Sequence, residues 1–132
     1  MNIEYLPLHQ LNARFRDTIN HATQQLLSSG RYLKGDATVQ FEKSYARYIG
    51  TQHCIGCGNG FDALQLIFRA YIELGRLQPG DEVLVPANTF IASILAITEN
   101  QLTPVLIEPR MADMQIDDSL LECAITSRTR AV

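Results

Sequence analysis

Hydrophobic positions in the first fifty residues recur every three or four residues. From Leu11 to Ser29 this spacing predicts one amphipathic helix. A glycine-containing turn follows over 30–35, and Asp36 is a suitable N-cap for a second helix that ends at Gly50. The apolar positions of the second helix are Phe41, Tyr45, Tyr48 and Ile49. We expect both to be ordinary helices packed on a surface.

Beyond residue 52 short apolar runs alternate with helical periodicity. The predicted strands cover 53–57, 83–85, 104–107 and 130–132. The predicted helices cover 61–74, 90–100 with Asn88 or Thr89 as cap, and a stretch that starts at Asp117 or Asp118. The first of these helices is expected to bury Ala63, Leu64, Ile67, Phe68 and Tyr71. The alternation predicts an α/β fold with parallel strands and right-handed crossover helices.

The last predicted strand has barely begun when the sequence ends at Val132. A parallel strand that is buried on both faces normally continues as an apolar run. Three parallel strands also leave open sheet edges, which proteins usually cover. We therefore expect residues 1–132 to be part of a domain and not a whole one.

The composition narrows the class of protein. With 46% hydrophobic and 19% charged residues, the chain has the composition of a folded globular domain. A formal net charge of −3 and scattered basic residues argue against nucleic acid as a partner. No apolar run is long enough to span a membrane, and the first five residues lack the features of a signal peptide.

The three cysteines favour the reducing cytoplasm over a secreted disulfide framework. Cys54 and Cys57 form a C-x-x-C pair, but no second pair completes a zinc site. On a strand, residues three apart also point to opposite faces. We interpret these cysteines as small buried hydrophobic residues and predict no metal site.

The segment from Cys54 to Leu64 carries the strongest chemical signal. Glycines stand at 56, 58 and 60, just before a predicted helix. Glycine can adopt the backbone conformations that a sharp turn requires, and it leaves no side chain in front of the main-chain N–H groups. The helix N-terminus offers unpaired N–H groups and the positive end of its dipole to an anion such as phosphate. A dinucleotide fingerprint fails because Phe61 replaces its third glycine. A P-loop fails because neither Lys34 nor Lys43 follows a glycine within a Gly-Lys-Ser/Thr motif.

Two motifs make the chain similar to a known family. They are Gly58-Asn59-Gly60-Phe61-Asp62-Ala63-Leu64 and Gly80-Asp81-Glu82-Val83-Leu84-Val85-Pro86-Ala87-Asn88-Thr89-Phe90. They resemble the DegT/DnrJ/EryC1/StrS aminotransferases, pyridoxal-phosphate enzymes of fold type I that act on nucleotide-linked keto sugars. The resemblance implies that 1–132 is the N-terminal part of the large, cofactor-binding domain. The branch that it resembles most aminates C3 of dTDP-3-keto-6-deoxyhexoses.

The resemblance also implies roles for residues of this chain. The amides around Gly60, Phe61 and Asp62 would hold the phosphate of pyridoxal phosphate, and Phe90 would stack on its ring. The Asp62 carboxylate would repel that phosphate, so we expect it to turn away toward a local backbone N–H.

Tyr32 and Lys34 could reach the diphosphate of the substrate, across a dimer interface. No catalytic residue is assigned, because the family's lysine, which bonds to the cofactor, and its pyridine-binding acid lie beyond the point that corresponds to Val132. The chain by itself is therefore expected to be inactive.

The implied reaction transfers an amino group from glutamate to a keto carbon of a dTDP-linked 6-deoxyhexose. Such sugars serve lipopolysaccharide, S-layer glycan or antibiotic synthesis, and the implied enzyme is a cytoplasmic homodimer. Two alternatives stay open. One is a sugar 3-dehydratase of the same family, in which a histidine replaces the lysine. The other is a non-catalytic remnant that acts only in binding or dimerisation.

Overall fold

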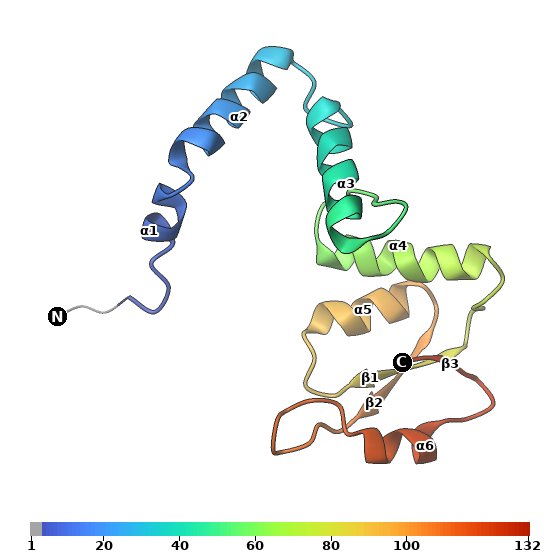
Figure 1. The fold of residues 1–132 in the computed structure, drawn as a ribbon. Coiled ribbons are helices and arrows are strands. Elements are labelled where there is room, and N and C mark those ends of the chain that lie inside the picture. The colour runs from blue at the N-terminus through green and yellow to red at the C-terminus, as the bar shows by residue number, and fades with distance from the viewer. Residues whose placement is uncertain (1–3) are drawn as a thin grey trace. The chain divides into compact units, whose positions relative to one another are not determined.

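The computed structural model describes residues 4–132, and it divides the chain into two compact units. Unit 1 is the described part of Met1–Gly56, and unit 2 is Cys57–Val132. The interpretation that the chain has no signal peptide rests partly on residues 1–3, which lie outside the described residues. Each unit is taken by itself below (Figure 1).

Unit 1 contains three helices: α1 (Leu8–Ala13), α2 (Arg16–Ser29) and α3 (Asp36–Ile49). The single helix predicted over 11–29 is wrong in one respect, because the chain leaves helical geometry at Phe15, where φ is −116° and ψ is 7°. The predicted helix ends near Ser29 and Gly50 are confirmed, but the first helix begins at Leu8 and not at Leu11. The N-cap predicted at Asp36 is wrong, because Gly35 occupies the cap position and Asp36 is the first helical residue, with no side-chain bond to a backbone amide. Gly30 and Gly50 follow α2 and α3 with φ of 63° and 83°, a left-handed conformation that glycine adopts without steric cost.

The apolar faces of unit 1 remain exposed. Ala46 is the one buried side chain within the helices of the described part of unit 1. On α3, the rings of Phe41 and Tyr45 stack at 5.6 Å between centroids, yet both are about half exposed. The expectation of surface-packed helices is therefore wrong for unit 1 by itself, because helical periodicity creates an apolar face without providing a surface to cover it.

Residues 51–59 connect α3 to the next helix without regular structure. The strand predicted over 53–57 is wrong: the Gly56 N–H donates to Glu42 Oε1 at 2.7 Å instead of joining a neighbouring strand. Backbone groups need partners, and here a side chain supplies one.

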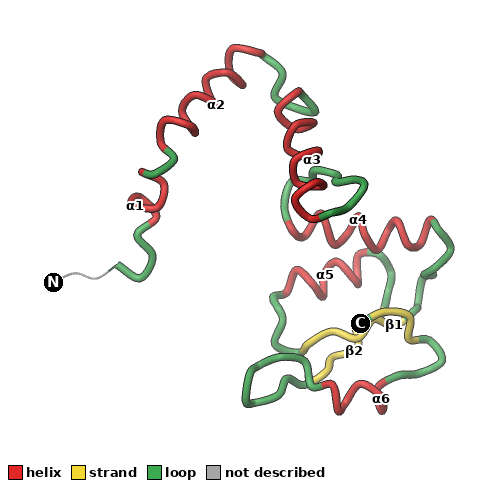
Figure 2. Tube along the Cα trace, in the orientation of Figure 1, coloured by secondary structure: helices red, strands yellow, loops and turns green. Residues whose placement is uncertain are grey.

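Unit 2 is an α/β unit with a three-stranded parallel sheet in the order β2-β1-β3. Its elements are α4 (Gly60–Glu73), β1 (Glu82–Pro86), α5 (Ile91–Glu99), β2 (Thr103–Ile107), the 3₁₀ helix η1 (Asp118–Leu120), α6 (Leu121–Ala124) and β3 (Thr129–Ala131). Figures 1 and 2 show α4 and α5 on one side of the sheet and α6 on the other. The predicted parallel sheet is confirmed.

The core of unit 2 lies between the sheet and the helices α4 and α5. Its buried cluster consists of Leu77, Val83, Val85, Ile97 and Leu102, against which Phe68, Ile72 and Ile94 pack. Ile67 and Tyr71 were expected on the buried face of α4, but they are 50% and 41% exposed. The three-stranded sheet covers only a narrow stripe of α4. The apolar side chains beside this stripe, including Ile67 and Tyr71, therefore lie outside the core.

The third strand is attached to the first through the side chain of Glu82. This carboxylate is buried and accepts hydrogen bonds from Thr126 Oγ1 (2.6 Å), Arg128 Nη2 (2.6 Å) and Thr129 Oγ1 (3.2 Å). The bond from Thr126, with help from the Arg128 guanidinium, lowers the pKa of Glu82. The carboxylate thus holds the segment before β3 in register with β1.

Candidate functional site

The N-terminus of α4 contains the glycine-rich segment from which the sequence predicts a phosphate site. Asn59 caps the helix: its Oδ1 accepts the Asp62 N–H at 3.0 Å, and its Nδ2 donates to Asp62 Oδ2 at 3.0 Å. The amides of Gly60 and Phe61 have no acceptor among the described residues. These two N–H groups, at the positive end of the helix, are the donors open to an anion.

The space around the two glycines of this turn differs. A side chain at Gly58 would place its Cβ 2.7 Å from Asp62 Oδ2, so the Asp62 carboxylate folds back over Gly58. A Cβ at Gly60 would meet nothing within 4 Å. The chain is therefore uncrowded at Gly60, and the free N–H donors of the helix end suit the charge of a phosphate.

Asp62 behaves differently from the expectation. Its carboxylate accepts from the Asn59 side-chain amide and not from a backbone N–H, and its own N–H is occupied by Asn59. Asn59, the cap of α4, was not among the predicted site residues. The spacing of Asn59 and Asp62 is that of a helix N-cap and the acidic residue three positions on, a signal that was available in the sequence.

Phe90 lies in the segment that follows the carboxyl end of β1, directly before α5, and the residue is 78% exposed. In parallel sheets, ligands bind outside the carboxyl ends of the strands. Figure 1 shows the N-termini of α4 and α5 at the same end of unit 2. The unit thus presents an open aromatic ring and two free amides at one end.

The cap predicted for α5 is wrong. Neither Asn88 nor Thr89 bonds to a backbone amide of the helix: Asn88 Nδ2 donates to Met114 O at 3.0 Å, and Thr89 Oγ1 donates to Ser93 Oγ at 3.1 Å. Phe90 itself occupies the cap position.

Tyr32 and Lys34, the predicted substrate-binding residues, belong to unit 1, whereas Gly60, Phe61 and Phe90 belong to unit 2. Tyr32 is 59% exposed, and its hydroxyl donates weakly to Leu27 O at 3.4 Å. Lys34 has φ of 51°, a left-handed conformation that is uncommon for a residue with a side chain.

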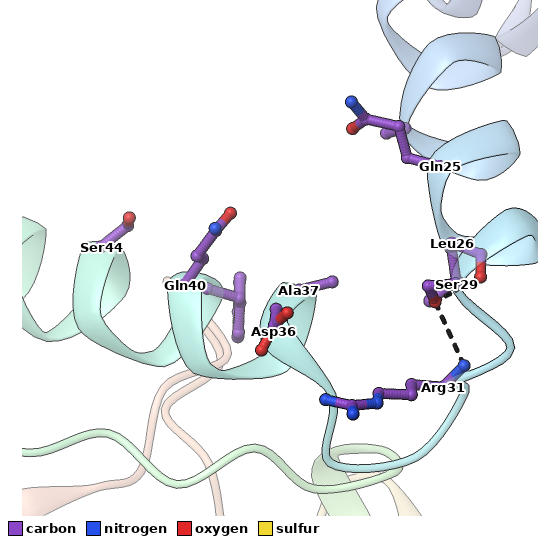
Figure 3. Close-up of a pocket in the computed structure, with 10 residues that line it drawn as sticks. Gln25, Leu26, Ser29, Arg31, Asp36, Ala37, Gln40 and Ser44 are labelled. Carbon is purple, nitrogen blue, oxygen red and sulfur yellow. Dashed lines mark hydrogen bonds between the residues drawn. The ribbon is translucent and has the colours of Figure 1, made fainter.

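Unit 1 has a hollow of about 460 Å³ between α2 and α3 (Figure 3). Its apolar lining includes Ala22, Leu26, Ala37 and Phe41, and its polar lining includes Arg31 and Asp36. Tyr32 and Lys34 do not line it. None of the predicted site residues therefore lines this hollow.

Across residues 4–132, no cluster of three or more potential metal ligands occurs. Cys54 is half-buried and Cys57 is exposed, which does not fit the interpretation of both as buried hydrophobic residues. Within the same range, no helix has the length and apolar character needed to cross a membrane.

Comparison with known proteins gives a family match and close relatives. Residues 14–132 match the model of the DegT/DnrJ/EryC1/StrS aminotransferase family. The chain is 48% identical over 130 residues to the dTDP-3-amino-3,6-dideoxy-alpha-D-galactopyranose transaminase of Aneurinibacillus thermoaerophilus, covering 98% of this chain and 35% of the relative. The chain thus spans about a third of the length of the curated relatives that it matches.

Solved structures are also similar to this chain. S. venezuelae DesV is 42% identical with a TM-score of 0.85, covering 96% of this chain and 33% of DesV. NtdA from Bacillus subtilis, with bound cofactor PMP, is 32% identical with a TM-score of 0.80, covering 97% of this chain and 29% of NtdA. PMP is the aminated form of pyridoxal phosphate, so the predicted cofactor is confirmed for the family, as is the predicted α/β fold of type I. The chain belongs to the DegT/DnrJ/EryC1/StrS aminotransferase family.

Proposed function

We propose that residues 1–132 form the N-terminal part of the pyridoxal-phosphate-binding large domain of a nucleotide-sugar aminotransferase. The observation that carries the proposal is that α4 and α5 begin at the same end of unit 2, α4 with the free Gly60 and Phe61 amides and α5 with the exposed Phe90 at its cap position. One feature suits a phosphate and the other an aromatic ring, and pyridoxal phosphate has both. Family membership supports the assignment.

In this proposal the complete protein transfers an amino group from glutamate to a keto carbon of a dTDP-linked 6-deoxyhexose. The support is the 48% identity to a dTDP-amino-sugar transaminase over nearly the whole chain. Products of this kind enter lipopolysaccharide or antibiotic synthesis. The cytoplasmic location stays a prediction from the cysteine content.

The residues of this chain bind and orient the cofactor. Gly60 and Phe61 donate their N–H groups to its phosphate, and the dipole of α4 favours the negative charge. Phe90 stacks on the ring and shields one face of it from water. Bound pyridoxal phosphate supplies an electron sink that allows an amino group to move between two carbon skeletons.

In this proposal Asp62 contributes less to phosphate binding than Gly60 and Phe61 do. Its N–H would reach the phosphate only if Asn59 Oδ1 released it, because the two are bonded at 3.0 Å. The Asn59 amide holds the Asp62 carboxylate on the Gly58 side of the turn, which limits its repulsion of a phosphate in front of Gly60.

Tyr32 and Lys34 are proposed to bind the diphosphate of the nucleotide sugar. The positive charge of the exposed Lys34, which suits a diphosphate, and the exposure of Tyr32 (59%) support this role. We further propose that the complete protein is a homodimer.

The test removes one phosphate donor without harming the helix. Gly60→Pro eliminates the N–H at the first helical position, where proline is well tolerated, and Asn59 already has the extended backbone that precedes proline (φ −163°, ψ 179°). A hydrogen bond to a charged group contributes about 1.5–3 kcal/mol, so pyridoxal-phosphate affinity should fall by roughly tenfold to a hundredfold.

Gly60→Ala is the matched control, because it adds a methyl group into open space and keeps the N–H. Equal affinities for the proline and alanine variants of the full-length protein would contradict the phosphate assignment. The reaction itself is tested separately with glutamate and a dTDP-linked keto sugar: an aminated product supports the proposal, and deoxygenation without amination identifies a dehydratase.

A further inference from the structure

The ring of Phe90 has no polar atom to anchor it, so the backbone on either side determines its position. On the α5 side, Ser93 N donates to Phe90 O at 3.0 Å, and the Thr89 and Ser93 hydroxyls bond at 3.1 Å. The helix thus fixes the backbone that follows the ring. What precedes it is the short segment that leaves β1.

That preceding segment is attached at two points to β2 and to the chain beyond it. Ala87 N donates to Ile107 O at 2.8 Å, which extends the β1–β2 ladder by one bond. Asn88 Nδ2 donates to Met114 O at 3.0 Å, twenty-six positions farther along the chain. The second attachment is a side chain that bridges the segment after β1 and the loop after β2.

The loop that receives this bond, which we call the β2 arm (residues 108–118), has its own internal framework. Arg110 N donates to Gln115 O and Met114 N to Arg110 O, each at 2.8 Å, and Pro109 forms an antiparallel bridge with Ile116. The Arg110 guanidinium also pairs with Asp113 at 3.1 Å and with Asp118 at 2.7 Å. The arm is therefore closed on itself.

Met114, at the point of contact, has φ of 59°, an unusual value for a residue other than glycine. Its carbonyl nevertheless accepts the Asn88 amide. A side chain that bridges to a braced loop restricts its own backbone, and Phe90 follows two residues later.

We propose that Asn88 is a positioning residue for the cofactor ring: by bonding to the β2 arm, it sets the backbone from which Phe90 presents its face. This inference rests on the proposed function, because it gives Phe90 the stacking role. Asn88 does not touch the cofactor, and its effect passes through Phe90.

The experiment compares the wild-type full-length protein with Asn88→Asp, which keeps the size of the side chain but replaces the donor by a carboxylate facing a carbonyl. Asn88→Ala is the second variant, in case the carboxylate prevents folding. Three readouts are pyridoxal-phosphate affinity, the visible circular dichroism band of the bound cofactor, and amide hydrogen exchange of 86–93 without cofactor. We expect affinity to fall about threefold to tenfold, the band to shrink, and exchange to quicken.

Asn100→Asp is the matched control, since it removes the same kind of donor, here to Ala96 O at 2.9 Å, at the other end of α5. It should leave the dichroism band unchanged. If both Asn88 variants match the wild type in affinity and band, or if Asn100→Asp alters the band equally, the inference is wrong while the proposed function stands. If the wild type binds no pyridoxal phosphate, the proposed function fails, and this inference fails with it.

Discussion

Units 1 and 2 differ in how their apolar side chains are used. In unit 2, strands and helices alternate, and Leu84 and Ile97 are almost completely inaccessible. In unit 1, three helices carry comparable apolar residues, but Phe41 and Tyr48 are 57% and 83% exposed. A sheet gives helices a common surface on which to bury one face, whereas an amphipathic helix beside another does so only when the two touch closely. A sequence can therefore specify regular helices without also specifying a buried core.

The largest expected contrast comes from truncating one isoleucine in each unit. Ile97→Ala should lower the free energy of unfolding by about 2–5 kcal/mol, because a fully buried side chain leaves a cavity. Ile19→Ala, at a position that is 49% exposed in α2, should change it by no more than about 0.5 kcal/mol. Urea unfolding followed by circular dichroism measures both. Equal losses would show that Ile19 is buried in the folded protein and would contradict the contrast between the two units.

The next contrast concerns Glu82, whose carboxylate joins β3 to the rest of unit 2. Since its pKa is lowered in the folded protein, the carboxylate contributes stability above the usual value of 4.5, and this contribution is lost as the pH falls through the folded pKa. Glu82→Gln should lower the Tm by several degrees at pH 7, and by less and less as the pH falls below 4.5. A melting-temperature difference that is independent of pH would contradict this role.

Substitutions at helix ends should lower the free energy of unfolding by similar amounts in both units. Asn59→Ala removes the cap of α4 and should cost about 1 kcal/mol. Gly50→Ala places a side chain at φ of 83° after α3 and should also cost about 1 kcal/mol. Backbone chemical shifts of the adjacent helical turns report the fraying. Asn59→Ser, which keeps an oxygen acceptor for the cap, should leave α4 intact.

The smallest effect on stability is expected on the aromatic stripe of α3. Replacing Phe41 and Tyr45 by glutamine should change the unfolding free energy by no more than about 0.5 kcal/mol per site. It should nevertheless remove much of the fluorescence of ANS, a dye that binds exposed apolar surface. Lys43→Gln, on the same helix, is the control and should leave the dye signal unchanged. A large loss of stability in the glutamine variant would mean that these rings are buried in solution.

The sequence allowed most elements to be predicted, because glycines 30, 50 and 75 and the apolar periodicities act locally. The strand over 53–57 was wrong since a strand needs a neighbour, and no local signal reports whether one exists. The cap of α5 was wrong for the same reason: the partner of Asn88 lies in the β2 arm. Part of the candidate site followed from glycine spacing, but the occupation of the Asp62 amide by Asn59 required the geometry of the turn.

The order of the sheet has a consequence for how unit 2 assembles. Its central strand, β1, is the first strand to leave the ribosome, and β2 can pair with it soon afterwards. Glu82 and Thr129 are separated by 47 positions, more than twice the separation of Glu82 and Thr103. Each doubling of a loop costs about 0.6 kcal/mol in closure entropy. We therefore expect β1, α5 and β2 to form the folding nucleus, with β3 arriving last on a carboxylate already in place.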